Sequence, residues 1–205
     1  MDQFAPSDAK RYVEVASSNS SDHVLLQDIV IRRPAQVDVL ALAAHFSEMQ
    51  THYNCPVPDA VAVKAAALAC RPVATTFDPR VLIALAGSTV IGSVVMNVTF
   101  PASALTLSLY IRDLYVAKSA RRRGVGRMLV EAANHLRASE GFSALEWTTD
   151  SSNAAARKLY ETCGARQMDR TYFNERRGTT RPVAAEGRVH STLDAVNVRI
   201  LPGGS

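Results

Sequence analysis

The run of residues that most clearly suggests chemistry is 121–126, which reads Arg-Arg-Arg-Gly-Val-Gly. It follows a strand-like segment at 111–116 and precedes an amphipathic helical pattern at 128–139. Glycines lack a Cβ atom, so backbone N–H groups at such a turn can approach a ligand closely. The first turn of a helix also presents unpaired N–H donors and the positive end of a dipole. With arginines that are always charged, this segment predicts a binding site for an anion.

Two familiar nucleotide-binding turns do not fit this run. A dinucleotide fingerprint needs a third glycine after Gly124 and Gly126, but Leu129 stands at that position. A P-loop ends in Gly-Lys-Ser or Gly-Lys-Thr, and this run does not. From these six residues alone, a tight strand-to-helix turn with solvated arginines remains the alternative.

A second group of spaced residues lies in the helical pattern at 153–162. Asn153 and Tyr160 are seven residues apart, so they share one face of a helix. Ala156 between them leaves room for a narrow ligand to pass between the two polar side chains. Taken alone, Asn153 could equally be a helix-start residue and Tyr160 a half-buried packing residue.

Together these segments resemble the GNAT superfamily of N-acetyltransferases, and the resemblance spans roughly residues 25–175. The family's pyrophosphate loop is Arg/Gln-x-x-Gly-x-Gly/Ala, which 121–126 matches, after a strand that ends in Leu-x-Val, as 114–116 does. Its second motif is Asn-x-x-Ala-x-x-x-Tyr followed by a glycine, which 153–160 and Gly164 match. Small-amine members of the diamine type look most similar.

The resemblance implies that acetyl-CoA is the co-substrate and lies where two strands splay apart. The backbone of Val116 would contact the pantetheine arm, as Asn153 would, whereas the side chains of Leu114 and Val116 are expected in the core. Tyr160 would protonate the leaving thiolate, and a backbone donor would hold the developing oxyanion. The residues implied for the co-substrate are Leu114, Tyr115, Val116, Arg121, Arg122, Arg123, Gly124, Val125, Gly126, Arg127, Asn153, Ala156 and Tyr160.

The group that deprotonates the acceptor amine is less closely defined. Asp113, on the strand before the glycine turn, is the second catalytic candidate, and Glu146 or Asp150 on the neighbouring strand are alternatives. Diamine-type relatives often carry a carboxylate just before this aspartate, where the chain has Arg112. The motif therefore does not determine which amine is the substrate.

Other reactive side chains have simpler interpretations. Glu48 and Asp59 lie where the family builds its acceptor wall, but each could be a solvated surface carboxylate. His52 and Tyr53 could line the same pocket, although a packed or exposed histidine is the simpler interpretation. Cys163 is not expected to act as a nucleophile, because no histidine near it in sequence could activate it and direct transfer needs no acyl-cysteine. The five histidines show no metal-ligand spacing, so no metal is expected.

Composition narrows the class of protein. The chain has 205 residues, 47% of them hydrophobic and 20% charged, which suits one substantial domain with a real core. The net charge of +4 is mild and concentrated in 121–127 and 166–181, so a nucleic-acid partner is not expected. The three cysteines form no CxxC pair, which is typical of reduced thiols in the cytoplasm. Neither a signal peptide nor a membrane span is recognised in the sequence.

The hydrophobic patterns predict a mixed α/β (α+β) fold. Strands are expected at 25–31, 81–86, 90–99, 105–116, 144–149 and 165–173, and helices at 35–53, 60–69, 128–139 and 153–162. The resemblance implies a GNAT fold, with a twisted, mostly antiparallel central sheet flanked by helices and a splayed strand pair that binds CoA. Expected domains are a flexible leader at 1–23, the acetyltransferase domain at 24–175, and an extension at 176–205 that could add a strand at 193–201.

The predicted function is transfer of the acetyl group of acetyl-CoA directly onto a primary amine of a small molecule. A protein or peptide N-acetyltransferase and a non-catalytic acyl-CoA-binding protein remain alternatives. An acetyltransferase toxin acting on charged tRNA would show the same motif. The extension at 176–205 could cross to a partner chain, which would make a homodimer.

Overall fold

The computed structural model describes residues 29–169. The chain divides into two compact units, Met1–Gln167 and Met168–Ser205, and every helix and strand of the described residues belongs to the first. The expected leader, the first part of the first strand and the extension lie outside the described residues.

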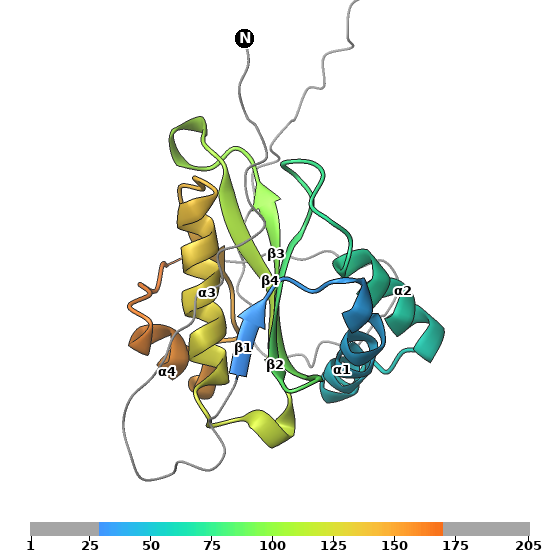
Figure 1. Ribbon diagram of the computed structural model, residues 1–205. Helices are drawn as coiled ribbons and strands as arrows, with labels where there is room; N and C mark the ends of the chain where they lie inside the picture. Colours follow the sequence, from blue (N-terminus) through green and yellow to red (C-terminus); the bar gives the residue numbers. More distant parts are fainter. Residues whose placement is uncertain (1–28, 170–205) are drawn as a thin grey trace, which may run out of the picture. The chain divides into compact units, whose positions relative to one another are not determined.

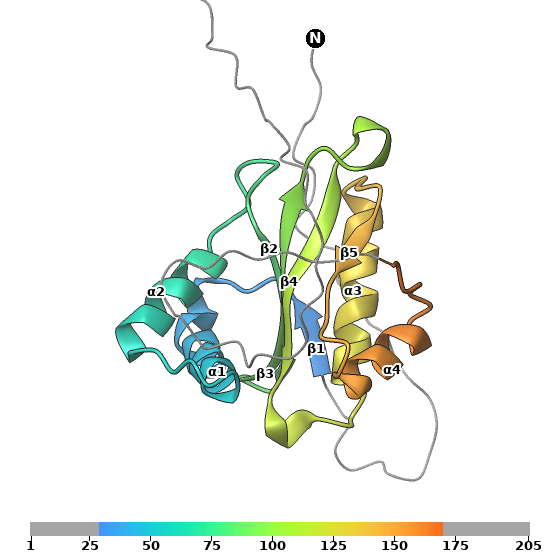
Figure 2. The same ribbon diagram turned by 180° about the vertical axis from the view of Figure 1, so that it is seen from behind.

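The first unit is built on a five-stranded sheet with the order β1-β2-β3-β4-β5 (Figures 1 and 2). The strands are β1 Ile29–Arg32, β2 Arg80–Ala86, β3 Thr89–Thr99, β4 Ser108–Val116 and β5 Leu145–Trp147. The first four pair antiparallel in sequence order, with the expected β2–β3 hairpin, and β5 pairs parallel to β4. The predicted mixed, mostly antiparallel sheet is therefore confirmed.

Helices cover both faces of this sheet, as Figures 1 and 2 show. Helices α1 Val39–His52 and α2 Asp59–Ala69 lie on one side, and α3 Val125–Ser139 and α4 Ala154–Thr162 lie on the other. Single 3₁₀ turns occupy Gln36–Asp38, Ser103–Leu105 and Lys118–Ala120. The parallel β4–β5 pair needs a crossover, and α3 supplies it.

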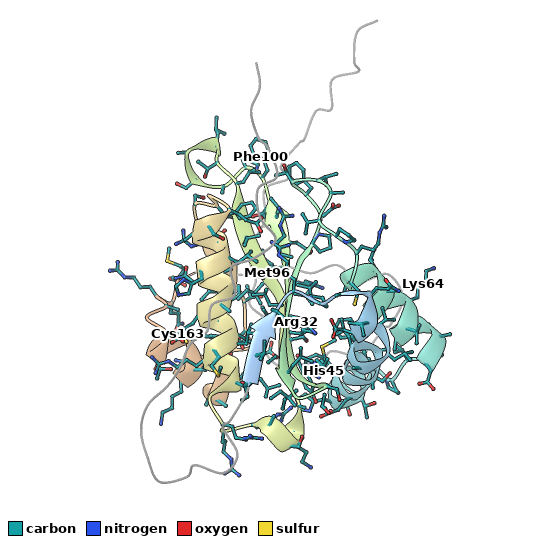
Figure 3. The ribbon with its side chains drawn as sticks, in the orientation of Figure 1. Arg32, His45, Lys64, Met96, Phe100 and Cys163 are labelled. Carbon is teal, nitrogen blue, oxygen red and sulfur yellow. The ribbon has the colours of Figure 1, made fainter. Side chains whose placement is uncertain are left out.

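Two hydrophobic clusters hold the layers together because successive strand residues point to opposite faces. In β2, Ile83 packs with Leu42 of α1, whereas its neighbour Leu82 packs with Leu129 of α3. Burial on both faces explains why β2 reads as an almost continuous apolar run. Figure 3 shows His45 on the α1 side of the sheet and Cys163 on the side of α3 and α4.

Several predicted boundaries need correction. The glycine-turn helix begins at Val125 rather than 128, because Gly124 already provides the N-cap. The strand expected from 105 begins at Ser108, because Ala104 and Leu105 adopt positive φ angles in a turn. The strand expected at 144–149 forms only over 145–147.

The strand expected at 165–173 is wrong over 165–169. These residues form no regular secondary structure, and the rest of the predicted strand lies outside the described residues. Only Ala165 in this stretch is even partly buried, and Met168 is 64% exposed. Strand formation depends on packing of a half-buried face, which these side chains do not provide.

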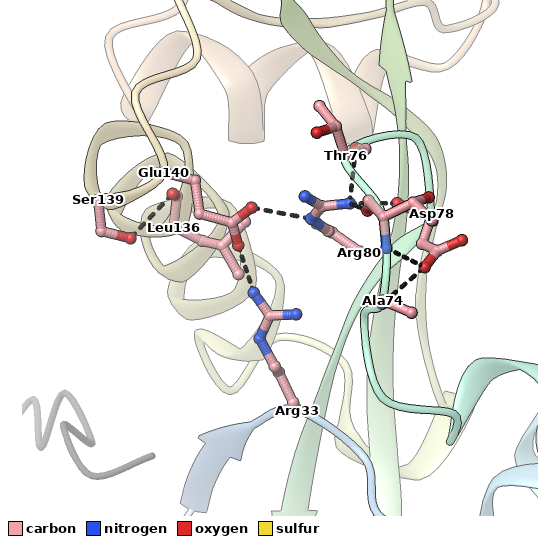
Figure 4. A network of polar contacts seen from close by, with 9 residues as sticks. Arg33, Ala74, Thr76, Asp78, Arg80, Leu136, Ser139 and Glu140 are labelled. Carbon is pink, nitrogen blue, oxygen red and sulfur yellow. Dashed lines mark hydrogen bonds and ion pairs between the residues drawn. The ribbon is translucent and has the colours of Figure 1, made fainter. Parts of the chain in front are cut away.

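A buried arginine ties the start of β2 to the end of α3 (Figure 4). Arg80 is 4% exposed, and its Nε donates to Glu140 Oε2 at 2.8 Å. Its Nη1 donates to the carbonyl of Thr76 at 2.9 Å, and its Cζ lies 5.5 Å from the centre of the Phe142 ring. Arg33, after β1, also pairs with Glu140. This network anchors the end of α3 that is opposite to the glycine turn.

Candidate active site

The glycine turn joins the end of β4 to the start of α3. Gly124 has φ +77°, a left-handed conformation that favours glycine, and Arg122 before it also has a positive φ of 61°. The N–H of Met128 donates to the Gly124 carbonyl at 3.0 Å, which closes the first helical turn. The N–H groups of residues 125–127 therefore lack an acceptor within the helix and are available to an anion.

Gly126 lets the two motifs of the sequence pack closely against each other. A Cβ atom at this position would lie 3.2 Å from Leu159 Cδ2 on α4 and 3.8 Å from Val116 Cγ2 on β4. The first distance is tighter than ordinary van der Waals contact, so a side chain here would require Leu159 to shift by a few tenths of an ångström. The turn and the helix of Asn153 and Tyr160 are thus direct neighbours.

Arg121 and Arg127, at the two ends of the turn, contact neighbouring groups of the protein. Arg121 Nε donates to the Val116 carbonyl at 3.1 Å, and Arg121 Cζ lies 5.5 Å from the centre of the Tyr115 ring. Arg127 Nε pairs with Glu131 Oε1 at 2.7 Å on the exposed face of α3. Arg121 therefore holds the turn against β4.

The last part of β4 has an open edge. Residues 109–111 pair with 145–147 of β5, and β4 then continues to Val116 after β5 has ended. The N–H of Ala117 donates to Ile91, beside the Gly92–Val116 pair. In an antiparallel ladder this makes Val116, and Leu114 two residues earlier, positions whose polar backbone groups face away from β3. The expected splayed edge is present, and Arg121 already occupies the Val116 carbonyl.

A β-bulge in β4 decides which way Asp113 points. Val95 pairs with Asp113 and Met96 with Ile111, so Arg112 is the extra residue. Ile111 packs in the cluster on the α3 side, whereas Tyr115 packs on the α1 side. Because Asp113 is two residues before Tyr115, the bulge places its carboxylate on the α1 side of the sheet.

Asp113 meets a tyrosine that the sequence did not single out as catalytic. The Tyr53 hydroxyl, just after α1, donates to Asp113 Oδ1 at 3.1 Å. Burial raises the pKa of Asp113, while the Tyr53 hydrogen bond, the Arg112 charge and the Leu114 N–H oppose this rise. The sequence indicates Tyr53 only as a possible pocket residue, because 60 positions separate it from Asp113.

Tyr160 lies near the same carboxylate, on α4. Its ring centre is 5.0 Å from that of Trp147, the last residue of β5. Burial and the negative charge of Asp113 both raise the pKa of Tyr160, so its hydroxyl keeps its proton at neutral pH. The site thus combines a carboxylate that can accept a proton with a phenol that can donate one.

Asn153 caps α4. Its Oδ1 accepts the N–H of Ala156 at 3.1 Å, which is the helix-start role considered from the sequence. This cap engages only Oδ1, and Asn153 is exposed. At the other end of α4, burial raises the pKa of the Cys163 thiol, which disfavours the nucleophilic thiolate.

The other candidate carboxylates are placed differently. Glu48 Oε1 accepts the Tyr115 hydroxyl and the Lys118 N–H, each at 3.0 Å, so it connects α1 with the end of β4. Glu146 accepts from Ser108 Oγ at 3.1 Å. Asp59 starts α2 and Asp150 precedes α4, and both are exposed. Glu48 and Glu146 therefore each accept hydrogen bonds from groups of the protein that differ from Tyr53, the partner of Asp113.

Between residues 29 and 169, no three His, Cys, Asp or Glu side chains are grouped so that they could hold a metal ion. None of the helices in this range has the length and apolar character needed to cross a lipid bilayer.

Solved structures with a similar fold were found. An integron cassette protein from the mobile metagenome of V. cholerae is 25% identical, covers 73% of this chain and 93% of its own, and has a TM-score of 0.61. A probable acetyltransferase is 21% identical over 75% of this chain and all of its own, with a TM-score of 0.64. AAC(6')-Iy, in complex with the bisubstrate analogue CoA-S-monomethyl-acetylneamine, is 16% identical. The match covers 74% of this chain and 100% of that one, with a TM-score of 0.60. These likenesses support the fold.

A search of curated proteins found no match. A family model described as Acetyltransferase (GNAT) family matches residues 47–165. The matched segment includes the glycine turn, the open edge of β4, Asp113 and Tyr160, and it covers more than half of the 205 residues. The protein therefore belongs to the GNAT family of acetyltransferases, which use acetyl-CoA.

Proposed function

We propose that this acetyltransferase moves the acetyl group of acetyl-CoA directly onto a primary amine of a small molecule. The observation that carries the proposal is the placement of Asp113 on β4, beside its open edge, with Tyr160 on α4 close enough for the charge of Asp113 to act on its hydroxyl. A proton acceptor and a proton donor at one place are what direct transfer to an ammonium group requires. We assign this function to residues 24–175, with 1–23 as a leader and 176–205 as an extension.

The residues around the glycine turn suit the co-substrate. The free N–H groups of 125–127, with Arg122 and Arg123 beside them, would hold the pyrophosphate. The Val116 N–H and the Leu114 carbonyl, which face away from β3, would pair with the pantetheine arm as an added strand does. Asn153 would contact the same arm from α4. Bound in this way, acetyl-CoA supplies the acetyl thioester.

The protein's own groups then have distinct tasks. Asp113 would take a proton from the acceptor ammonium, so that the nitrogen carries a free electron pair. A backbone N–H on the open edge of β4 would hold the negative charge that develops on the acetyl oxygen. Tyr160 would give its proton to the departing sulfur, a contribution of about 10²- to 10⁴-fold for a well-placed acid.

A small cationic amine suits the surroundings of Asp113. The carboxylate is half-buried and has Tyr53 and Tyr160 nearby, and carboxylates and aromatic rings both attract ammonium groups. One of the similar structures is an aminoglycoside acetyltransferase from an uncultured soil metagenomic sample in complex with sisomicin, and AAC(6')-Iy is in complex with a bisubstrate analogue that joins CoA to an acetylneamine. Aminoglycosides and simple diamines are therefore the first acceptors to test.

A panel of acceptors, scored by release of free CoA, tests the proposal. The panel should hold diamines, aminoglycosides, amino acids, short peptides and charged tRNA. We expect turnover with at least one small amine. Turnover with peptides or charged tRNA alone would contradict the small-molecule assignment. Binding of acetyl-CoA without CoA release from any acceptor would indicate a non-catalytic acyl-CoA-binding protein.

A further inference from the structure

Tyr53 connects the end of α1 to the Asp113 carboxylate on β4, across 60 positions of sequence. We propose that Tyr53 is a positioning residue for the acceptor amine: its hydroxyl holds Oδ1 of Asp113, and Oδ2 is left to receive the amine. The inference rests on the proposed function, because it concerns how the acceptor is bound and deprotonated. It adds a residue to the site from a segment outside both cofactor motifs.

The backbone and ring of Tyr53 are held in place from several sides. Its backbone N–H donates to Met49 at 3.1 Å and so ends α1. Its ring centre lies 5.5 Å from that of His52 and 6.3 Å from that of Tyr115. Tyr115 is itself buried and bound to Glu48. Yet Tyr53 is 46% exposed, so an acceptor can reach the pair from solvent.

Within the described residues, the Asp113 carboxylate is not paired with a cation at close range, although the charge of the preceding Arg112 acts on it. Among the ion pairs of residues 29–169, none involves Asp113, although its carboxylate is partly buried. A carboxylate removed from water without a cationic partner is unfavourable. An incoming ammonium group would supply that partner. The neutral Tyr53 hydroxyl can orient the carboxylate without competing for this charge.

The titratable and charged groups that face Asp113 come from three elements. Tyr53 approaches from α1, Tyr160 from α4, and Arg112 precedes it on β4. The residue paired with Asp113 on β3 is Val95, which does not titrate. The Tyr53 hydrogen bond lowers the pKa of Asp113 against the effect of burial, so it favours the ionised form that can accept a proton.

The proton balance follows from these positions. One proton moves from the ammonium nitrogen to Oδ2 of Asp113 and later leaves to solvent. The freed electron pair forms the C–N bond with the acetyl carbon as the C–S bond breaks. Tyr160 gives its proton to the sulfur and is restored by the second proton of the nitrogen. Tyr53 keeps its proton throughout, which agrees with the rise in its pKa that burial and Asp113 cause.

The first test compares pH profiles of kcat/KM for the intact wild-type protein and Tyr53→Phe with the best amine of the panel. Loss of the hydroxyl raises the pKa of Asp113, so the acidic limb should move to higher pH. We expect kcat/KM to fall about three- to tenfold on the acidic limb, as the loss of a hydrogen bond to a partly exposed charged group predicts, and to fall less on the plateau above it.

Tyr110→Phe is the matched control, because it removes a hydroxyl from the same strand that bonds Thr148 at 2.7 Å instead. Its acidic limb should stay at the wild-type position. An acidic limb in Tyr53→Phe that coincides with the wild type, or an equal shift in Tyr110→Phe, would overturn the positioning role.

The second test needs no turnover. Carbon-13 NMR of the Asp113 carboxyl in the free protein should show a higher pKa in Tyr53→Phe than in the wild type. If the NMR titration moves but the pH profile does not, the contact exists and the positioning role is wrong. If neither moves, the contact itself is wrong. A wild-type protein that acetylates no amine overturns the proposed function instead, and the NMR titration shows whether the Tyr53–Asp113 contact stands without it.

Discussion

Glu48 on α1 and Tyr115 near the end of β4 are joined by a hydrogen bond of 3.0 Å from the tyrosine hydroxyl to Glu48 Oε1. The same oxygen accepts the N–H of Lys118, in the turn that follows β4. Arg121 lies over the Tyr115 ring and donates to the Val116 carbonyl. A continuous set of contacts therefore runs from α1 through the end of β4 to the glycine turn.

We expect Glu48→Ala to loosen the glycine turn. Removing the carboxylate lowers the free energy of unfolding by about 1 kcal/mol, because two hydrogen bonds at an exposed charged group are lost. If the turn becomes less ordered by this amount, acetyl-CoA should bind about fivefold more weakly. Urea unfolding and calorimetric titration measure the two effects.

Glu131→Ala is the control, because it breaks only an exposed pair on α3. It should change the free energy of unfolding by less than about 0.5 kcal/mol. Equal CoA affinity in Glu48→Ala and the wild type would contradict the connection.

Gly124→Asp should abolish binding of acetyl-CoA at the turn. The left-handed φ of +77° makes any side chain unfavourable by about 1 kcal/mol or more, and the carboxylate also repels a pyrophosphate. Gly124→Ala isolates the conformational part. Gly87→Ala is the control, since its φ is +60° and a Cβ there also meets no atom within 4 Å. It should lose similar stability and bind acetyl-CoA normally. Unchanged binding by Gly124→Asp would place the pyrophosphate site elsewhere.

Tyr160→Phe tests the assigned acid. We expect kcat to fall about 100-fold or more, because the departing sulfur loses its proton donor. The dissociation constant of acetyl-CoA should remain close to that of the wild type, since the ring keeps its contact with Trp147. Steady-state rates and equilibrium binding separate the two quantities. A variant that turns over at the wild-type rate while it binds acetyl-CoA would show that another group donates the proton.

Arg80→Met should be among the more destabilising single changes in the described residues. It removes the cation from a buried network and leaves Glu140 and several carbonyls without their donor, at a cost of about 2–4 kcal/mol. Thermal and urea unfolding report the loss. Arg33→Met removes only the more exposed partner of Glu140 and should cost less than about 1 kcal/mol. Similar losses in both variants would mean that burial of Arg80 is not the decisive factor.

His45 should make stability depend on pH. Its side chain is buried beside Ser93, and burial lowers its pKa from 6.5 to about 4, although the Glu48 charge and the Val90 backbone oppose the change. Between these two values the unfolded chain binds more protons than the folded one, so stability falls as the pH is lowered. The free energy of unfolding should drop by about 3 kcal/mol from this group across that window.

His45→Gln should remove that part of the pH dependence, measured by urea unfolding at a series of pH values. His135→Gln, at an exposed position on α3, should retain it. A wild-type slope that survives in His45→Gln would assign the effect to other groups.

Local patterns in the sequence already contained much of the fold, including the glycine turn and the helix that carries Tyr160. The order of helices and strands over the described residues, the glycine turn and the helix of Tyr160 depend on hydrophobic periodicity, glycine conformation and spacing within one element. Element ends were less accurate: β4 starts later because of the turn at Ala104 and Leu105, and 165–169 form no strand because their side chains are mostly exposed. These are questions of packing, which periodicity does not decide.

The acceptor side of the site depended on contacts between distant segments. Nothing near Tyr53 in sequence indicates that it bonds Asp113, and nothing near Glu48 indicates that it bonds Tyr115, since 60 and 67 positions separate these pairs. The bulge at Arg112, which turns Asp113 toward α1, is likewise visible only in the pairing of β3 with β4. The sequence by itself determined the family and the turn that suits acetyl-CoA, because backbone chemistry there is local. Only the tertiary structure decided which carboxylate meets Tyr53, because that contact depends on how α1 packs against the sheet.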